Sequence, residues 1–573
     1  MTDFDLVIRG GSVIDGSGAP ARAGDVAVKD GSIVAVGDVP GSGRNEVDAD
    51  GALVTPGWVD IHTHYDGQAT WDDHLAPSSW HGVTTIVMGN CGVGFAPVHP
   101  TDHARLISLM EGVEDIPGAA LHEGLQWDWQ SFPEYLDAVG RRRHDVDVAA
   151  QVPHGAVRLF VMGDRGANRE PATADEIAEM GRIAAAAVQA GALGFTTSRT
   201  LNHRTSTGDP TPTLTAAREE LVGIAKAIGE TGAGVLQVVS DFIDFDDEIG
   251  TLRAMAEVSQ RPLSISVAQA PRSPLHYRRI LDAISESNEE GLEVRAQVAT
   301  RAIGILLGLQ GSVNPLARSA TYNAMADLPL AERVARLSDP DVKTTILGEF
   351  REHPMRTVPL DQVYELGESP EYEPDPSMSV KARAAREGVA PDALLYDLLL
   401  GAGGSALLYV PILNYADGNL DAVREMLAHP HTVPGLSDGG AHVGTICDGS
   451  FPTSLLTHWG RDRTRGDRFE VPWLVKRQTA DTAAAVGLLD RGRLAPGYRA
   501  DINVIDFDRL ALGAPQLVFD LPAGGKRLLQ RASGYEHTFV AGVETFTGGE
   551  ATGALPGQLI RGAQPSPTNG SAR

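Results

Sequence analysis

The stretch VTPGWVDIHTHYD, residues 54–66, decides how the rest of the chain is interpreted. Its apolar run at 58–61 is typical of a buried strand and leads directly into two histidines one residue apart, His62 and His64. Because side chains at positions i and i+2 of a strand point to the same face, the two imidazoles should project together. They would form half of a divalent metal site, and nitrogen ligands of this kind favour zinc. The alternative is a pair of exposed or hydrogen-bonded histidines.

The composition excludes some partners and cellular locations for this protein. The 573 residues carry 75 acidic and 48 basic side chains, a net charge of −27 that makes nucleic acid and anionic membranes poor candidate partners. Two cysteines are too few for a disulfide framework, and the opening MTDFDLVIRGG shows no export signal, which predicts a cytoplasmic protein. The longest uncharged run, 398–416, contains glycines and a proline and is interpreted as a helix end, a turn and a buried strand rather than a membrane span.

Strand and helix patterns alternate after the histidines. A capping box of Thr173 and Glu176 predicts a helix over 173–190. Further candidate strands lie at 84–88, 147–152, 193–198, 234–240, 262–268 and 292–298. Such alternation indicates βα units around a parallel sheet, and eight units close into a barrel.

The two ends of the chain have a different character. Residues 1–57 and 491–562 carry short alternating strands, with a hairpin signal at Asp30-Gly31, so we expect them to meet as one small β domain beside a barrel of residues 58–490. Within the barrel, residues 339–380 are rich in Pro, Glu and Asp and are interpreted as a loop-like lid or a solvated loop. The tail, 563–573, is predicted to be disordered.

Polar residues follow the predicted barrel strands at their carboxyl ends, where barrels place active sites. His62 and His64 follow the first strand and Cys91, in GNCG, follows the second. His154, in PHGAVR, follows the third, and Asp438, in GLSDGGAH, fits the last. Convergence of such groups from distant positions is what a metal site needs.

Taken together, these segments resemble the amidohydrolase superfamily, specifically its N-acyl-D-amino-acid deacylase branch. The resemblance covers nearly the whole chain, in the segments LVIRGGSVIDGSG, PGWVDIHTHYDGQ, TTIVMGNCGVGFAP, PHGAVR, GALGFTTS, GLSDGGAH, GRLAPGYRADINVID and ATGALPGQLIRG. Each motif alone is weak, but their occurrence in order is highly specific. The resemblance implies a distorted (β/α)8 TIM barrel, a small β-sandwich made from both chain ends, and zinc-dependent hydrolysis of an amide.

The resemblance also implies roles for individual residues. His62 and His64 correspond to the first-strand metal ligands, Cys91 to a thiolate ligand, and Asp438 to the catalytic aspartate that contacts the metal and shuttles protons. It implies one or two Zn2+ ions, of which we favour one. From the residues alone, Cys91 could equally be a buried thiol and Asp438 a turn residue.

The chain departs from the family at the fifth and sixth strands, which normally supply two more histidines. The matching stretches GVLQVVSDF and PLSISVAQAP contain none, and Val239 and Val267 stand about where those ligands would be. Three hypotheses follow: one zinc held by His62, His64 and Asp438 with Cys91 or water, a site rebuilt with His154, His203 or His442, or a binding protein that kept the barrel and lost the chemistry.

For a substrate, Arg158 and Arg199 are candidates to bind a carboxylate, because a guanidinium matches two carboxylate oxygens. The alternative for each is a structural ion pair. His154, His203 and His442 are further candidate substrate contacts. An arginine in the cavity would predict an N-acyl (D-)amino acid or a related carboxylate-bearing amide as the small-molecule substrate, with a cyclic amide as the main alternative. Chirality, acyl group and oligomeric state, including a homo-oligomer, stay open.

Overall fold

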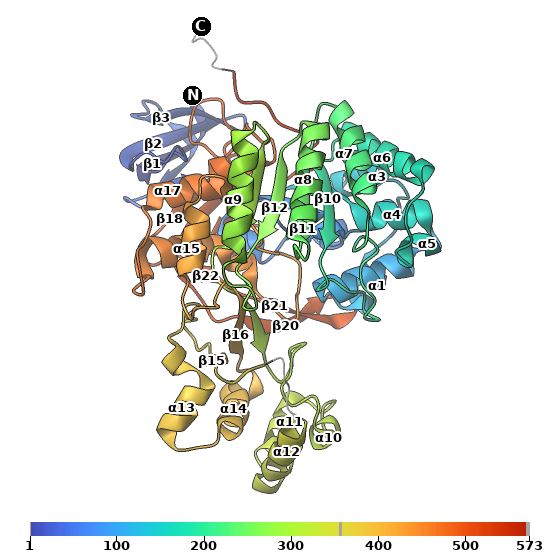
Figure 1. The fold of residues 1–573 in the computed structure, drawn as a ribbon. Helices are drawn as coiled ribbons and strands as arrows, with labels where there is room; N and C mark the ends of the chain where they lie inside the picture. The colour runs from blue at the N-terminus through green and yellow to red at the C-terminus, as the bar shows by residue number, and fades with distance from the viewer. Residues whose placement is uncertain (1, 354–357, 569–573) are drawn as a thin grey trace.

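The computed structural model describes residues 2–353 and 358–568, and a parallel barrel forms its body (Figure 1). The barrel strands are β6 (Trp58–Asp60), β7 (Val83–Met88), β8 (Asp147–Ala150) with β9 (Val152–Pro153), β10 (Gly194–Arg199), β11 (Val235–Ser240), β12 (Leu263–Val267), β13 (Val294–Val298) and β17 (Thr432–Pro434). They pair in two parallel sheets, β6-β7-β8 and β9 through β13 to β17. A parallel bridge between Thr63 and Gly439 joins the last strand to the first. The predicted distorted (β/α)8 barrel is therefore confirmed, with the break between β8 and β9 as a visible distortion.

Helices cover the outside of these strands (Figure 1). The helices of the barrel region are α1 (His103–Glu114), α2 (Gly118–Gly124), α3 (Phe132–Gly140), α4 (His154–Met162), α5 (Asp164–Ala167), α6 (Ala174–Gln189), α7 (Arg218–Glu230), α8 (Phe245–Ser259), α9 (His276–Glu289), α15 (Asp421–Ala428), α16 (Phe451–Thr457), α17 (Val471–Lys476) and α18 (Thr482–Ala485). The helix predicted over 173–190 is α6. Its capping box is formed as expected, because Thr173 accepts from the Glu176 N–H while the Glu176 carboxylate accepts from the Thr173 N–H. Met180, Ala184 and Val188 form its buried face.

The two ends of the chain build one nine-stranded sheet beside the barrel. Its strands are β1 (Phe4–Val13), β2 (Arg22–Lys29), β3 (Ser32–Gly37), β4 (Gly43–Asp48), β5 (Leu53–Pro56), β18 (Ile502–Ile505), β23 (Tyr535–Val540), β24 (Val543–Thr547) and β25 (Glu550–Ala551). The ends meet where β18 pairs antiparallel with β5. The predicted hairpin joins β2 to β3, and Asp30 and Gly31 have φ of 50° and 74°, as a type I′ turn requires.

Part of the C-terminal segment leaves this sheet and reaches the barrel mouth. The short strands involved are β19 (Ala511–Leu512), β20 (Gln516–Leu521), β21 (Gly525–Leu529) and β22 (Ala532–Ser533). The β20–β21 hairpin contacts the loop after β17, where the Leu528 N–H donates to the Val443 carbonyl at 2.6 Å. The tail is also attached, since Gln564 pairs with Gly487 and Leu489. The predicted disorder is therefore wrong at Gln564, and residues 569–573 lie outside the described residues.

A lobe inserted between β13 and β17 projects from the barrel (Figure 1). It consists of β14 (Ile303–Leu307), α10 (Ala320–Asn323), α11 (Leu330–Leu337), α12 (Pro340–Glu352), β15 (Tyr364–Glu365), α13 (Val380–Glu387), α14 (Pro391–Leu399) and β16 (Leu408–Leu413). It encloses its own apolar cluster, which includes Leu307, Leu347 and Leu395. The uncharged run 398–416 is a helix end, a turn and a strand, as predicted.

The loop-like interpretation of 339–380 is wrong for its first part. Asp339 caps α12 by accepting from the N–H groups of Asp341 and Val342, and Pro340 occupies the first helical turn, where its missing N–H costs nothing. The insertion is also longer than predicted, because the strands on both sides belong to it. Residues 354–357 lie outside the described residues, and a lid role for 339–380 stays a prediction.

Glu373 fastens the lobe to the barrel. Its buried carboxylate accepts from Arg463 at 3.0 and 3.1 Å and from the Leu420 N–H at 2.8 Å, and it lies 3.1 Å from Nε2 of His458. Burial by itself raises the pKa of Glu373, but the hydrogen bonds from His458 and Arg463 outweigh it and lower the pKa to about 2. The ionised carboxylate therefore stabilises the fold at neutral pH.

Replacing Glu373 by Gln should destabilise the fold by about 3 kcal/mol, because Arg463 would lose its ionised partner in a buried position. Scanning calorimetry at pH 7 should show a melting temperature several degrees lower. The stabilisation is complete above the ordinary glutamate pKa of 4.5 and is lost as the pH falls toward about 2, so the difference should shrink in acid. The exposed Glu368→Gln is the matched control, and an equal shift in both variants would contradict the anchoring role.

Among the described residues, no helix combines the length and the apolar character that crossing a membrane requires. The cytoplasmic location stays a prediction.

Candidate metal centre

Backbone pairing between the first and last strands assembles the centre of the barrel mouth. The Asp438 N–H donates to the His62 carbonyl at 3.1 Å, and the His64 N–H donates to the Gly439 carbonyl at 2.8 Å. The closure of the barrel therefore places the loop after β17 directly against the His-x-His segment. This is how residues more than 370 positions apart in the sequence come to share one site.

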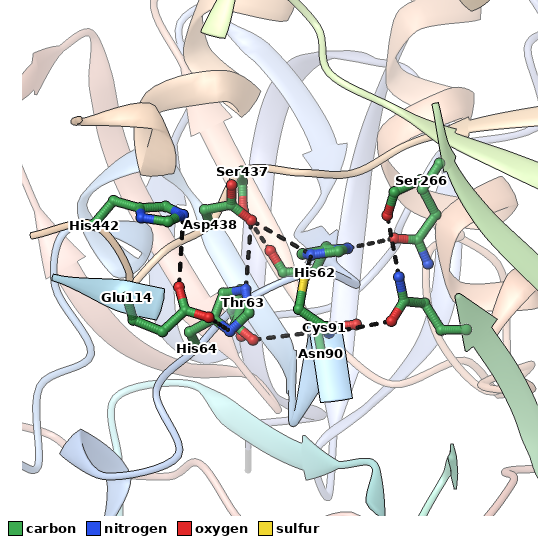
Figure 2. A network of polar contacts seen from close by, with 12 residues as sticks. His62, Thr63, His64, Asn90, Cys91, Glu114, Ser266, Ser437, Asp438 and His442 are labelled. Atoms are coloured by element: carbon green, nitrogen blue, oxygen red, sulfur yellow. Dashed lines mark hydrogen bonds and ion pairs between the residues drawn. The ribbon is translucent and has the colours of Figure 1, made fainter. Parts of the chain in front are cut away.

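Four side chains converge there (Figure 2). Nε2 of His62 lies 3.3 Å from Sγ of Cys91 and 3.4 Å from Oδ1 of Asp438. Nε2 of His64 lies 3.5 Å from the same Asp438 oxygen. Donors on a tetrahedral zinc ion stand about 3.3–3.6 Å apart, given metal–ligand distances of about 2.0–2.3 Å. The spacing and the donor set of two imidazoles, a thiol and a carboxylate therefore fit zinc.

Polar contacts on the far side of each imidazole direct Nε2 toward the centre. Nδ1 of His62 lies 2.6 Å from Oε1 of Gln297, and Nδ1 of His64 lies 3.1 Å from Oε1 of Glu114. An acceptor at Nδ1 places the ring proton there and leaves the Nε2 lone pair free for a cation. Both rings are thus oriented as metal ligands need to be.

A tight turn after β7 presents Cys91. Gly89 has φ 84°, and a Cβ there would lie 2.2 Å from the Gln151 carbonyl oxygen, so only glycine fits. Cys91 itself has φ 55°, a conformation that costs a non-glycine residue about 1–3 kcal/mol. Its N–H donates to Oε1 of Gln237 at 3.2 Å, which helps to hold the strained turn. Such strain is typical of functional sites.

The buried cluster has an uneven charge distribution. Burial opposes ionisation of Asp438, but the hydrogen bond with His64 and the charge of His62 hold its pKa well below the usual range. Burial lowers the pKa of His62 to about 4 and raises that of Cys91 to about 11. Burial also acts to lower the pKa of His64, yet the Glu114 charge and the Asp438 hydrogen bond raise it well above its ordinary value. A cation binding here would therefore displace protons from Cys91 and His64.

The wall that faces these donors carries neutral groups. Nε2 of Gln237 on β11 donates to Oγ of Ser266 on β12 at 3.1 Å, so both point into the barrel. By alternation along a strand, Val239 shares the inner face with Gln237. Val267 lies on the opposite face from Ser266 and packs in the apolar core. Ser266 is therefore the inward residue beside Gln237, and the assignment of Val267 to the missing ligand position stays a prediction.

His154 and Arg158 belong to a buried ion cluster away from the centre. Nδ1 of His154 lies 2.8 Å from Oγ1 of Thr197, and its Nε2 lies 2.9 Å from Oε1 of Glu220. Nε of Arg158 donates to the same Glu220 oxygen at 2.8 Å, and its remaining N–H groups donate to backbone carbonyls and to Oε2 of Glu220. Both side chains are fully buried and fully partnered. The structure contradicts the predictions that they contact substrate or metal.

The Arg199 side chain is also held in an internal ion pair. Its guanidinium donates to both carboxylate oxygens of Glu248, with contacts of 2.6 to 3.1 Å, and to the Ala216 carbonyl. This is a structural ion pair. The predicted contact of Arg199 with a substrate carboxylate is contradicted as well, because its guanidinium is already occupied.

His203 and His442 do lie near the centre. Nδ1 of His203 lies 2.9 Å from Oγ of Ser198, and burial lowers its pKa to about 3, with the charges of His442 and His64 acting in the same direction. His442 is 30% exposed and its Nε2 lies 3.6 Å from Oε2 of Glu114. Both remain candidates for substrate contact.

Glu114 and Gln297 were missed by the sequence reasoning. Glu114 ends an amphipathic helix in MEGVE, and Gln297 alternates with apolar residues in VRAQV. An inward polar residue at the end of the seventh strand was the only signal for Gln297. Nothing local distinguishes Glu114 from a solvated acidic residue.

Comparisons with known proteins agree with this geometry. A family model described as "Amidohydrolase family" matches residues 45–359 and 377–546. D-aminoacylase from Alcaligenes xylosoxydans xylosoxydans is 26% identical over 564 residues, which cover 97% of each chain. N-acyl-D-glutamate deacylase from the same organism is 28% identical, over 97% of this chain and 96% of the relative. A solved D-aminoacylase, described by its binuclear metal centre with one-metal activation and second-metal attenuation, has a TM-score of 0.65 and 25% identity and covers 97% of this chain and 100% of its own.

Proposed function

The chain belongs to the amidohydrolase family, and we propose that it is a metal-dependent hydrolase that cleaves the amide C–N bond of an N-acyl-D-amino acid or a related carboxylate-bearing amide. The observation that carries the proposal is the convergence of His62, His64, Cys91 and Asp438 at the barrel mouth. Full-length similarity to D-aminoacylase and to N-acyl-D-glutamate deacylase supports the substrate class.

His62, His64, Cys91 and Asp438 would hold one zinc ion. When bound, zinc polarises the scissile carbonyl and makes water more acidic. Three of these donors on the ion would leave its fourth position open for water. The neutral wall of Gln237, Val239, Ser266 and Gln297 supplies no imidazole or thiolate for a second ion, so we favour a single metal.

Asp438 is the catalytic residue of this proposal. Its low pKa keeps it ionised at neutral pH, so it can accept the proton of the attacking water. The same carboxylic acid then delivers that proton to the leaving nitrogen as the amide bond breaks. Nε2 of His64 lies 3.5 Å from Oδ1 of Asp438, so both groups face the position that the ion would take. His203 and His442 contact the substrate from the mouth.

A cyclic amide is the second candidate substrate. Arg158 and Arg199, the two arginines expected to bind a carboxylate, are both taken up by internal ion pairs. A cyclic amide needs no such contact, so the occupied arginines favour it as the second candidate. A binding protein without chemistry is disfavoured, because its metal donors would have no reason to stay oriented through Gln297 and Glu114. A homo-oligomeric assembly stays a prediction.

The test is an activity screen of the zinc-loaded protein on N-acyl-D-amino acids, their L counterparts and cyclic amides. Release of the free amine should be seen with D substrates and should exceed that with the L enantiomers. Hydrolysis of cyclic amides alone would replace the substrate class. Bound zinc with no turnover on the whole panel would overturn the proposed reaction.

A further inference from the structure

We propose that Glu114 is a positioning residue of the metal centre, whose two carboxylate oxygens hold the His64 ring and the His442 ring in place. The inference rests on the proposed function only in requiring a cation at His62, His64 and Cys91. It concerns a residue outside the donor set, on the last turn of α1. Figure 2 shows Glu114 between the two histidines.

Among the residues that the structure describes, no group hydrogen-bonds to the Glu114 carboxylate. The side chain is 1% exposed, and its oxygens lie 3.1 Å from Nδ1 of His64 and 3.6 Å from Nε2 of His442. Neither oxygen has a hydrogen bond to any described residue, so the contacts with His64 and His442 are contacts between charged or polar groups. An acidic group at the C-terminal end of a helix also opposes the helix dipole. Burying the Glu114 carboxylate at the end of α1 costs free energy. The interactions that offset this cost are those with the two histidines that it contacts.

The contact with His64 decides which imidazole nitrogen faces the cation. The Glu114 carboxylate, 3.1 Å from Nδ1 of His64, favours the ring proton on Nδ1, so the Nε2 lone pair points to the side where Asp438 lies at 3.5 Å. Without an acceptor at Nδ1, the ring could adopt the other tautomer or rotate away. Glu114 therefore supports the metal through His64, as carboxylates paired with metal-bound histidines do.

The contact with His442 connects the centre to the loop after β17. This loop is strained, since Asp438 and His442 have φ of 50° and 48°. It is also pressed against the first strand: a Cβ at Gly440 would lie 3.0 Å from the His64 backbone. By contacting His442 on one side and His64 on the other, Glu114 holds the loop of Asp438 in register with the His-x-His segment.

The experiment measures zinc affinity without substrate, by competition with a chromophoric chelator on the full-length protein. Glu114→Met, which keeps the length of the side chain but removes both oxygens, should weaken zinc binding by about 10- to 100-fold. The cobalt-substituted protein should show a changed ligand-field spectrum, because His64 is no longer fixed. Glu257→Met, at an exposed glutamate on α8, is the matched control and should leave the affinity unchanged.

Glu114→Asp keeps the charge but withdraws the carboxylate by one methylene, so it serves if the Met variant fails to fold. It should also bind zinc more weakly than the parent. A folded Glu114 variant with parental affinity and spectrum would overturn the positioning role while leaving the proposed function intact. A parent that binds no zinc would instead overturn the proposed function, and the positioning role with it.

Discussion

Asp438→Asn should lower kcat by about 10²- to 10⁴-fold, the range that a positioned general base contributes. The amide keeps the size of the carboxylate but cannot take a proton from water. KM should change much less, because Asp438 acts on the proton and not on the recognition of substrate. Steady-state kinetics of the zinc-loaded variant, with its zinc content measured in the same samples, separate a lost base from a lost metal.

The matched control is Asp508→Asn, an exposed aspartate far along the chain. It should retain parental kcat. Turnover of Asp438→Asn within a few-fold of the parent would show that another group moves the proton. If the parent shows no activity and Asp438→Asn binds ligand with unchanged affinity, the result would indicate a binding protein.

Removal of the metal by a chelator should reduce activity to the background rate, and one equivalent of zinc per chain should restore it. The donors lie on one side of the mouth, and the opposite wall is neutral, so a second equivalent should add nothing. His62→Ala and His64→Ala should each lower the zinc content, because each removes one imidazole from a small donor set. Elemental analysis and activity recovery are the two measurements.

His122→Ala, an exposed histidine on α2, is the control for histidine replacement and should keep its zinc. A requirement for two equivalents to reach full activity would contradict the single site. In that case, donors other than the neutral wall residues would have to form a second zinc site.

Several features of this chain follow from short stretches of sequence. Pairing of His62 with His64 depends only on strand alternation, and the start of α6 depends only on residues within one helical turn. The order of strands and helices indicated the barrel because the periodicity of each element is visible in its own sequence. The His62 and His64 pair of the candidate site could therefore be predicted from the sequence.

Other features depend on partners far away in the chain. Arg158 and Arg199 look like carboxylate binders until the fold brings Glu220 and Glu248 to them, 62 and 49 residues away. The size of the lobe was missed because its strands pair with each other across about a hundred residues, from β14 to β16. Whether a charge is buried and paired depends on the packed molecule, so the local sequence does not show it.

The sequence by itself determined the barrel class, the His-x-His pair and the absence of histidines from the fifth and sixth strands, because each is a matter of local order and residue type. The tertiary structure alone decided that Asp438 and Cys91 meet those histidines, that Gln297 and Glu114 orient them, and that two arginines are unavailable to a substrate. The physical reason is that coordination and ion pairing act over a few ångströms. Only the closed barrel brings groups separated by hundreds of residues within that range.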